Sequence, residues 1–208
     1  MKNNFQTVEE QTIFLEDVEP YTQFLNCQID THGQRKMLAD VIFSHCTFLV
    51  HDFSRAEWLD CEFKSCDFSN CTFESASLYR DKLQACKFVG TNFSHTIIKD
   101  TEFADCLMSY AFFPEAKLTA ARFLSSKMNE TSFQHVTLHK SQFKDSNLDL
   151  ADFSETVLKG LDWSSCSINV IRIDMALAAG LKIDTFQAAT LITLLGIEVT
   201  SAFDPESL

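Results

Sequence analysis

Residues 58–73 read WLDCEFKSCDFSNCTF, and this stretch decides the fold. Its four large aromatic side chains are each five residues apart, and a cysteine precedes three of them by two residues. The same step of five runs from Phe43 to Ile173, where 27 successive fifth residues are large and apolar. An α-helix has a period of 3.6 residues and a strand has a period of 2, so neither produces this pattern.

The position two residues before each large residue is mostly small, as Cys66, Ala76 and Ser126 illustrate. One large and one small inward side chain in every five residues fits a chain that turns a corner at each pentapeptide. Four pentapeptides then close a square coil of 20 residues, and the coils stack through backbone hydrogen bonds about 4.8 Å apart. The sequence therefore predicts an all-β solenoid, a quadrilateral β-helix of pentapeptide repeats.

Residues separated by 20 should form columns along the axis of such a solenoid. One column is Phe53, Phe73, Phe93, Phe113, Phe133, Phe153 and Ile173, and another is Trp58, Leu78, Ile98, Leu118, Leu138 and Leu158. The type of side chain therefore follows the face of the square, as stacked coils require.

The chain resembles the pentapeptide repeat family, whose consensus is a small residue, a polar residue, a central Leu or Phe and two polar residues. Asp67-Phe68-Ser69-Asn70 after Cys66 and Asp152-Phe153-Ser154-Glu155 after Ala151 are close matches. The resemblance is continuous over residues 38–173, and it implies a right-handed β-helix.

We expect three segments: an N-terminal cap over residues 1–37, the β-helix over 38–174 and a C-terminal capping and dimerisation module over 175–208. In the cap, Phe24 and Ile29 keep the step of five in a shifted register, and residues 5–15 are expected to form a strand or hairpin. Caps are expected because an open solenoid leaves strand edges exposed at both ends.

After Ile173 the pattern changes, and apolar residues recur at intervals of three and four residues. Asp184 or Thr185 can cap a helix, and Gly196 can stop it. The sequence predicts a short helix over about 185–195, followed by a strand.

This tail, with Phe186-Gln187-Ala188, Leu191 and Leu195-Gly196-Ile197, resembles the C-terminal dimerisation module of the Qnr and MfpA proteins. In that family, chains pair tail to tail into an acidic rod that resembles B-form DNA, binds DNA gyrase and other type II topoisomerases such as topoisomerase IV, and protects them from quinolones. The resemblance implies a homodimer formed by Phe186, Gln187, Ala188, Leu191, Leu194, Leu195, Ile197 and Val199. The chain departs from many family members because residues 43–173 contain no loop insertion.

Charge supports a basic partner. The formal net charge is −12, from 17 basic and 29 acidic residues, which argues against wrapping nucleic acid with a basic surface. One predicted face has six acidic residues against Arg55 and Arg172, a net of −4; its acidic residues are Asp52, Glu74, Glu115, Asp152, Glu155 and Asp174. The face centred on Trp58 to Leu158 has a net charge of +2. On a third face, Glu62, Lys82, Glu102 and Arg122 alternate in one column and should pair.

All eight cysteines fall on the small inward position, where buried Cys behaves as a small hydrophobic residue. His95, Glu115, His135 and Glu155 form an outward ladder, which is typical of surface ion pairs more than of a zinc site. No nucleophile constellation or phosphate loop is evident, so we expect no metal, no cofactor and no enzyme activity.

Leu107, Tyr110 and Phe112, beside Pro114, form a second candidate contact, although they could also line a bulge. No stretch approaches the roughly 18 apolar residues of a membrane span, so we expect a cytoplasmic protein without membrane contact. The alternative function is a structural or scaffolding repeat protein that binds an unrelated protein partner.

Overall fold

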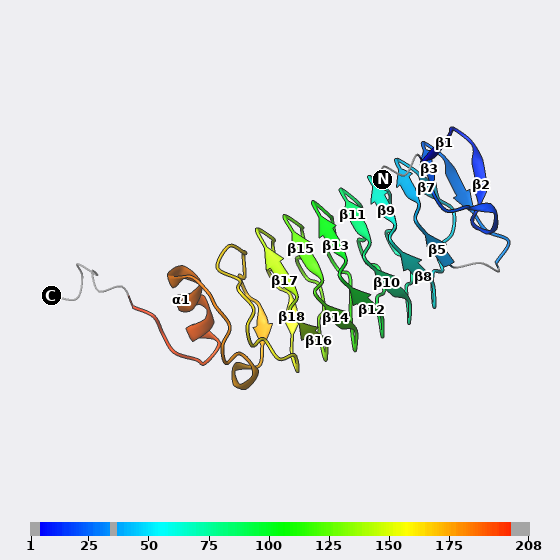
Figure 1. Ribbon diagram of the computed structural model, residues 1–208. Coiled ribbons are helices and arrows are strands. Elements are labelled where there is room, and N and C mark those ends of the chain that lie inside the picture. Colours follow the sequence, from blue (N-terminus) through cyan, green and yellow to red (C-terminus); the bar gives the residue numbers. More distant parts are fainter. Residues whose placement is uncertain (1–4, 34–36, 201–208) are drawn as a thin grey trace.

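Short parallel strands stack in ladders along most of the chain in the computed structural model, which describes residues 5–33 and 37–200 (Figure 1). The longest sheet has the order β1-β3-β6-β9-β11-β13-β15-β17. Its strands are β1 (Gln6–Glu9), β3 (Thr22–Leu25), β6 (Ile42–Ser44), β9 (Glu62–Lys64), β11 (Lys82–Gln84), β13 (Glu102–Ala104), β15 (Arg122–Leu124) and β17 (Gln142–Lys144).

A second sheet has the order β16-β14-β12-β10-β8-β5. Its strands are β5 (Met37–Ala39), β8 (Glu57–Leu59), β10 (Ser77–Tyr79), β12 (Ile97–Lys99), β14 (Lys117–Thr119) and β16 (Thr137–His139). Two smaller sheets complete the ladders: β2 (Thr12–Phe14), β4 (Gln28–Asp30) and β7 (Thr47–Phe48), and β18 (Asp152–Phe153) with β19 (Arg172–Ile173).

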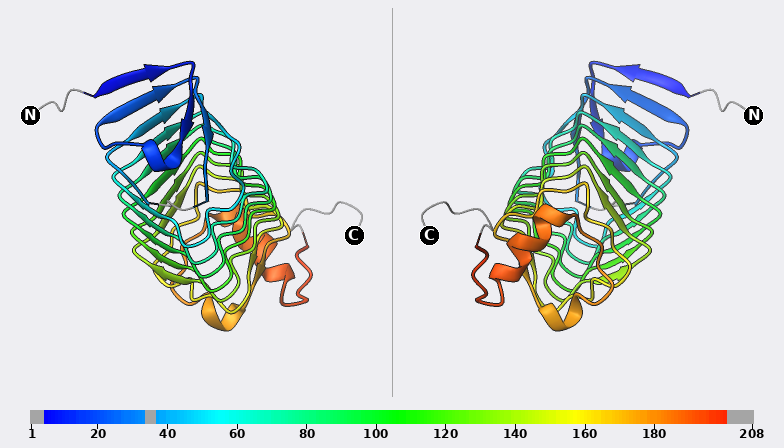
Figure 2. Two further views of the ribbon diagram at one scale, coloured as in Figure 1. Left: turned by 90° about the vertical axis from the view of Figure 1, so that its right-hand side faces the viewer. Right: turned by 90° about the vertical axis from the view of Figure 1, so that its left-hand side faces the viewer.

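The register confirms the predicted coil of 20 residues. Leu78 lies opposite Trp58 and Ile98, and the remaining two faces are joined by single parallel bridges such as that between Asp52 and Thr72. Views along the rod show the coils lying one behind another (Figure 2). The predicted β-solenoid is therefore confirmed.

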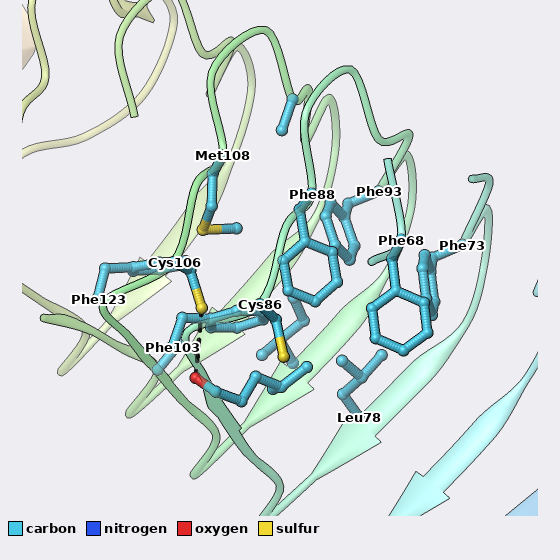
Figure 3. Close-up of a cluster of buried hydrophobic side chains, with 14 of the residues drawn as sticks. Phe68, Phe73, Leu78, Cys86, Phe88, Phe93, Phe103, Cys106, Met108 and Phe123 are labelled. Atoms are coloured by element: carbon cyan, nitrogen blue, oxygen red, sulfur yellow. Dashed lines mark hydrogen bonds between the residues drawn. The ribbon is translucent and has the colours of Figure 1, made fainter. Parts of the chain in front are cut away.

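The core consists of the predicted columns of side chains. Phe93 stacks on Phe113 with ring centroids 4.6 Å apart, and Phe53 stacks on Phe73 at 4.9 Å. Neighbouring columns meet edge to face, as Phe68 and Phe73 do at 5.8 Å (Figure 3). Offset and edge-to-face contacts of this kind add stability beyond the burial of apolar area.

A left-handed backbone recurs at every fifth residue over most of the repeat, two residues after the inward large side chain. Gly90, Gly160 and Gly180 occupy this corner position, but so do many residues with a Cβ atom. Val170 adopts the conformation with φ 54° despite its branched side chain. Each such residue costs conformational free energy, which the stacked core must offset.

The N-terminal coils continue the ladders and do not form a hairpin. β1 pairs in parallel with β3, and β2 pairs in parallel with β4, so the two strands belong to different sheets. Of the strand or hairpin expected for residues 5–15, the strand is confirmed by β1 and β2, whereas the hairpin is wrong, because each strand finds a partner in the next coil. Phe24 lies opposite Phe43, a separation of 19 residues, which accounts for the shifted register.

The ladder opens on two adjacent faces near the C-terminal end, and we call this opening the seam. Earlier coils are joined by backbone hydrogen bonds, but none forms between residues 137–145 and residues 157–165, all of which the structure describes. The Asp145 amide instead donates to the side-chain Oγ of Ser165 at 2.9 Å. Residues 157–165 still pair with the next coil, where the Trp163 amide donates to the Lys182 carbonyl at 2.9 Å.

We attribute the seam to Trp163. It occupies the column that earlier coils fill with Phe or Leu, and its ring meets Phe143 edge-on with centroids 6.4 Å apart. Phe123 and Phe143 stack at 5.0 Å. An edge-on indole takes more height than a stacked ring, so the two coils separate on its side of the rod.

The coil register continues beyond residue 174, where the sequence placed the end of the repeat, because Lys182 still pairs with Asp162. A short 3-10 turn, Met175–Leu177, lies in this last coil, as Leu15–Asp17 does in the first. The predicted helix is α1 (Thr185–Thr193), with Asp184 as its N-cap. No described helix is long and apolar enough to span a membrane.

The strand predicted after the helix is wrong for the single chain. Residues 197–200 form no strand, and no described strand pairs with them. A strand in this segment would need the edge of another strand as its hydrogen-bonding partner.

Candidate partner-binding surfaces

The acidic face is the flat side of the rod whose inward column runs from Phe53 to Ile173. Glu74, Glu115 and Glu155 are exposed and lie two coils apart in sequence, about 10 Å from one to the next. Glu115 and Glu155 have histidine neighbours: His95 Nδ1 lies 3.5 Å from Glu115, and His135 Nε2 lies 3.2 Å from Glu155. The predicted ladder is thus made of two separate surface pairs.

The other three acidic residues of this face are more closely engaged. Asp152 accepts hydrogen bonds from the Ser154 amide (2.9 Å), the Ser154 hydroxyl (2.6 Å) and Gln134 (2.8 Å), and Arg172 lies 3.8 Å away. Partial burial raises the pKa of Asp152, but these hydrogen bonds outweigh it and hold the pKa below its usual value. Asp152 is therefore an anion whose charge its neighbours partly satisfy.

Asp174 and Asp52 also bind local backbone. Asp174 accepts the Glu155 amide at 2.6 Å, and Asp52 accepts the Ser54 amide at 2.8 Å. Asp52, Arg55 and Glu74 line a common depression near the N-terminal half of the face. The structure thus distributes the six predicted residues over one face, with Glu74, Glu115 and Glu155 the most available to a partner.

The remaining faces carry less unbalanced charge. Lys82 lies 3.0 Å from Glu62, and Arg122 lies 3.0 Å from Glu102, so the predicted alternating column does pair. Arg80 binds Asp60 at 2.6 Å on the face centred on Trp58 to Leu158, which we call the lysine-rich face. Exposed pairs of this kind contribute little stability, but they reduce the field outside these faces.

The predicted apolar cluster is divided between two faces. Leu107 lies in a column between Lys87 and Lys127, while Phe112 lies between Asn92 and Ser132 at the start of the acidic face. Tyr110, at the corner between the two faces, is more exposed than either of them. Sequence reasoning missed Leu150 and Val170, which lie in the same outward column as Tyr110. Their spacing of 20 residues along one outward column is the sequence signal that identifies them.

The residues predicted for dimerisation have two different environments. Gln187 is buried: its side chain donates to the carbonyls of Trp163 (2.8 Å) and Cys166 (2.6 Å) and accepts the Asp184 amide (2.8 Å). Leu191 is also buried, and Ala188 is partly buried. These contacts attach α1 to the end of its own solenoid.

The other members of that set face outward: Phe186, Leu194, Leu195, Ile197 and Val199. Phe186 is 85% exposed, which is unusual for a phenylalanine. An apolar surface therefore remains uncovered on the far side of α1.

The cysteines behave as core residues. All eight are free and buried, and their thiols point to backbone carbonyls, as Cys106 does to Leu83 at 3.3 Å. Burial raises the pKa of Cys46, Cys71 and Cys106 to about 12 each, so these thiols stay protonated. No group of three or more His, Cys, Asp or Glu residues in the described part of the chain is placed to hold a metal ion.

Two family models match the repeat. The model for a pentapeptide repeat region matches residues 56–133, and the model for pentapeptide repeats in eight copies matches residues 116–154. This chain is a pentapeptide repeat protein. In this pentapeptide repeat protein, the matched residues end just before the coil that opens the seam.

A solved structure shares the fold. A trypsin-treated variant of QnrB1, a plasmid-mediated fluoroquinolone resistance protein, aligns over 94% of this chain and 98% of its own, with 22% identity and a TM-score of 0.55. Full-length QnrB1 aligns over 92% of this chain and 100% of its own, with 18% identity and a TM-score of 0.48. No curated protein sequence matches this pentapeptide repeat protein significantly.

Proposed function

We propose that this pentapeptide repeat protein is a homodimer that binds a type II topoisomerase as a mimic of duplex DNA. The partner is DNA gyrase, with topoisomerase IV as a second target, and binding modulates the enzyme or protects it from quinolones. A partner of this kind is consistent with the cytoplasmic location that the sequence predicts. The observation that carries the proposal is the flat acidic face with Glu74, Glu115 and Glu155 at regular heights.

The physical basis is electrostatic. A groove that binds DNA is lined with Lys and Arg, and it attracts any rigid surface of comparable length that carries negative charge. The eight-stranded ladder alone spans about 34 Å. Two such rods joined at their C-terminal ends have the length of roughly 20 base pairs.

The lower charge of the protein limits how closely it can mimic DNA. A duplex of 20 base pairs carries about 40 phosphates, whereas two chains with a net charge of −12 carry −24. Shape and other contacts therefore have to contribute to binding.

The test is gyrase supercoiling and its quinolone sensitivity with purified protein. The unchanged protein should alter one or both, and the triple variant Glu74→Lys, Glu115→Lys, Glu155→Lys should not. The triple variant Glu57→Lys, Asp100→Lys, Asp105→Lys changes the net charge equally on other faces and should behave as the unchanged protein does.

The proposal is refuted if the unchanged protein has no effect in either assay, or if the two triple variants act alike. Recovery of an unrelated protein in place of a topoisomerase would support the scaffolding alternative.

A further inference from the structure

Four exposed apolar side chains lie along one corner of the rod. Tyr110, Leu150 and Val170 occupy one outward column, with Leu150 two coils beyond Tyr110 and Val170 one coil further. Phe112 lies beside Tyr110, in the column of the acidic face that also contains Asp52 and Asp152. We call these four residues the apolar corner.

Folding does not explain their identities. Tyr110, Leu150 and Val170 have left-handed backbones, with φ of 62°, 61° and 54°. Gly90 stands at the equivalent position of another coil, where it avoids the cost that a Cβ atom brings.

Burial does not explain them either, because the side chains are 54%, 48% and 67% exposed. The nearby Glu130 carboxylate, in the same column, raises the pKa of the Tyr110 hydroxyl. Large apolar residues that stabilise neither the backbone nor the core are typical of a contact surface.

The corner is hollowed and continuous with the acidic face. Leu150 and Val170 border a groove whose other walls include Glu130, Gln134, Asp152 and Arg172, so that two acidic residues and one basic residue line it. Glu155 follows Leu150 in the same coil. A protein surface that covers both regions must therefore present apolar side chains next to basic ones.

We infer that the apolar corner is a second part of the partner-binding surface and contacts exposed apolar side chains at the rim of the topoisomerase's basic DNA-binding groove. This inference rests on the proposed function. Duplex DNA has no equivalent of these side chains, so the corner gives the protein a contact that DNA lacks. Salt screens electrostatic attraction but not apolar contacts. The affinity that the apolar corner contributes should therefore persist as the salt concentration rises, while the contribution of the acidic face declines.

The experiment measures the affinity of the full chain for purified DNA gyrase at several salt concentrations. The corner variant is Tyr110→Asn, Leu150→Asn, Val170→Asn; asparagine is well tolerated at left-handed positions, so the fold is retained. The control variant, Ile97→Thr, Val157→Asn, removes exposed apolar side chains from the lysine-rich face. The acidic-face triple variant provides the electrostatic comparison.

The corner variant should bind roughly tenfold or more weakly at every salt concentration, with the salt dependence unchanged. The acidic-face variant should reduce the salt dependence itself, and the control variant should bind normally. Unchanged affinity of the corner variant, beside weak binding of the acidic-face variant, would overturn this inference and leave the proposed function standing.

Two further outcomes are decisive. If the unchanged protein binds no gyrase at any salt concentration, the proposed function fails and this inference fails with it. If the corner variant alters the sedimentation of the protein alone, the corner is a contact between copies of this chain, and the inference is overturned.

Discussion

Asp81 occupies an inward position that Cys61 and Thr101 fill in the neighbouring coils. One carboxylate oxygen accepts the Cys61 amide at 2.8 Å, but the other is buried without a hydrogen-bond partner. Burial, assisted by nearby Asp60, raises the pKa of Asp81 to about 8. The native protein therefore holds a proton here at neutral pH, which the unfolded chain releases above pH ~4.

Replacement of Asp81 by serine should stabilise the protein, and more so at high pH. The stability due to the bound proton is fully present below pH ~4 and is lost as pH rises through about 8. Serine removes this loss and can accept the Cys61 amide, as Ser126 accepts the Cys106 amide at 3.1 Å. We expect a gain on the order of a few kcal/mol at pH 8.5.

The measurement is the guanidinium unfolding midpoint at pH 6 and pH 8.5. Glu57→Ser removes a carboxyl group from an exposed site and should leave the midpoint nearly unchanged at both pH values. An Asp81→Ser protein with the same pH dependence as the unchanged one would show that Asp81 does not hold the proton.

Val170 is strained for a local reason. Its left-handed φ of 54° is unfavourable for a β-branched residue. Val170→Asn should stabilise the protein by about 1 kcal/mol. Val157→Asn is a suitable control, because Val157 is similarly exposed and does not have a positive φ. If the Val170→Asn and Val157→Asn proteins have equal thermal unfolding midpoints, the claim that Val170 is strained is wrong.

At the scale of elements, we attribute the seam to one residue, Trp163. If the edge-on indole of Trp163 separates the two coils, Trp163→Phe should let the ring stack on Phe143 and restore the backbone hydrogen bonds. Hydrogen exchange should then slow at residues 140–145, while Trp58→Phe, in a closed part of the ladder, should leave these residues unaffected. Unchanged exchange in the Trp163→Phe protein would assign the seam to another cause.

The same scale shows what the sequence could predict. The large residues at every fifth position predict the sheets and the register, because stacking fixes both. The seam could not be predicted, since Trp163 satisfies the repeat and the sequence does not show that its ring lies edge-on to Phe143. The sequence also did not show which residues of α1 attach it to the solenoid and which face outward. Gln187 and Phe186 are adjacent in the sequence, and only the packed structure distinguishes the buried residue from the exposed one.

At the scale of the whole molecule, the exposed apolar side of α1 should join two chains. Phe186→Ser with Leu195→Ser should yield a monomer in analytical ultracentrifugation, without loss of fold, because Gln187 and Leu191 still attach the helix. Gln187→Ala should instead weaken the attachment of α1 to the solenoid by about 1–2 kcal/mol, because it leaves the carbonyls of Trp163 and Cys166 without a hydrogen-bond donor. A Phe186→Ser, Leu195→Ser protein that sediments as the unchanged protein does would exclude this surface as the dimer contact.

Competition with DNA tests the central claim most directly. Gyrase bound to the unchanged protein should release it as duplex DNA longer than roughly 20 base pairs is added, and the acidic-face triple variant should bind gyrase much more weakly than the unchanged protein does. Simultaneous binding of duplex DNA and this protein to gyrase, with no loss of affinity for either, would contradict the claim that the acidic face occupies a DNA-binding groove.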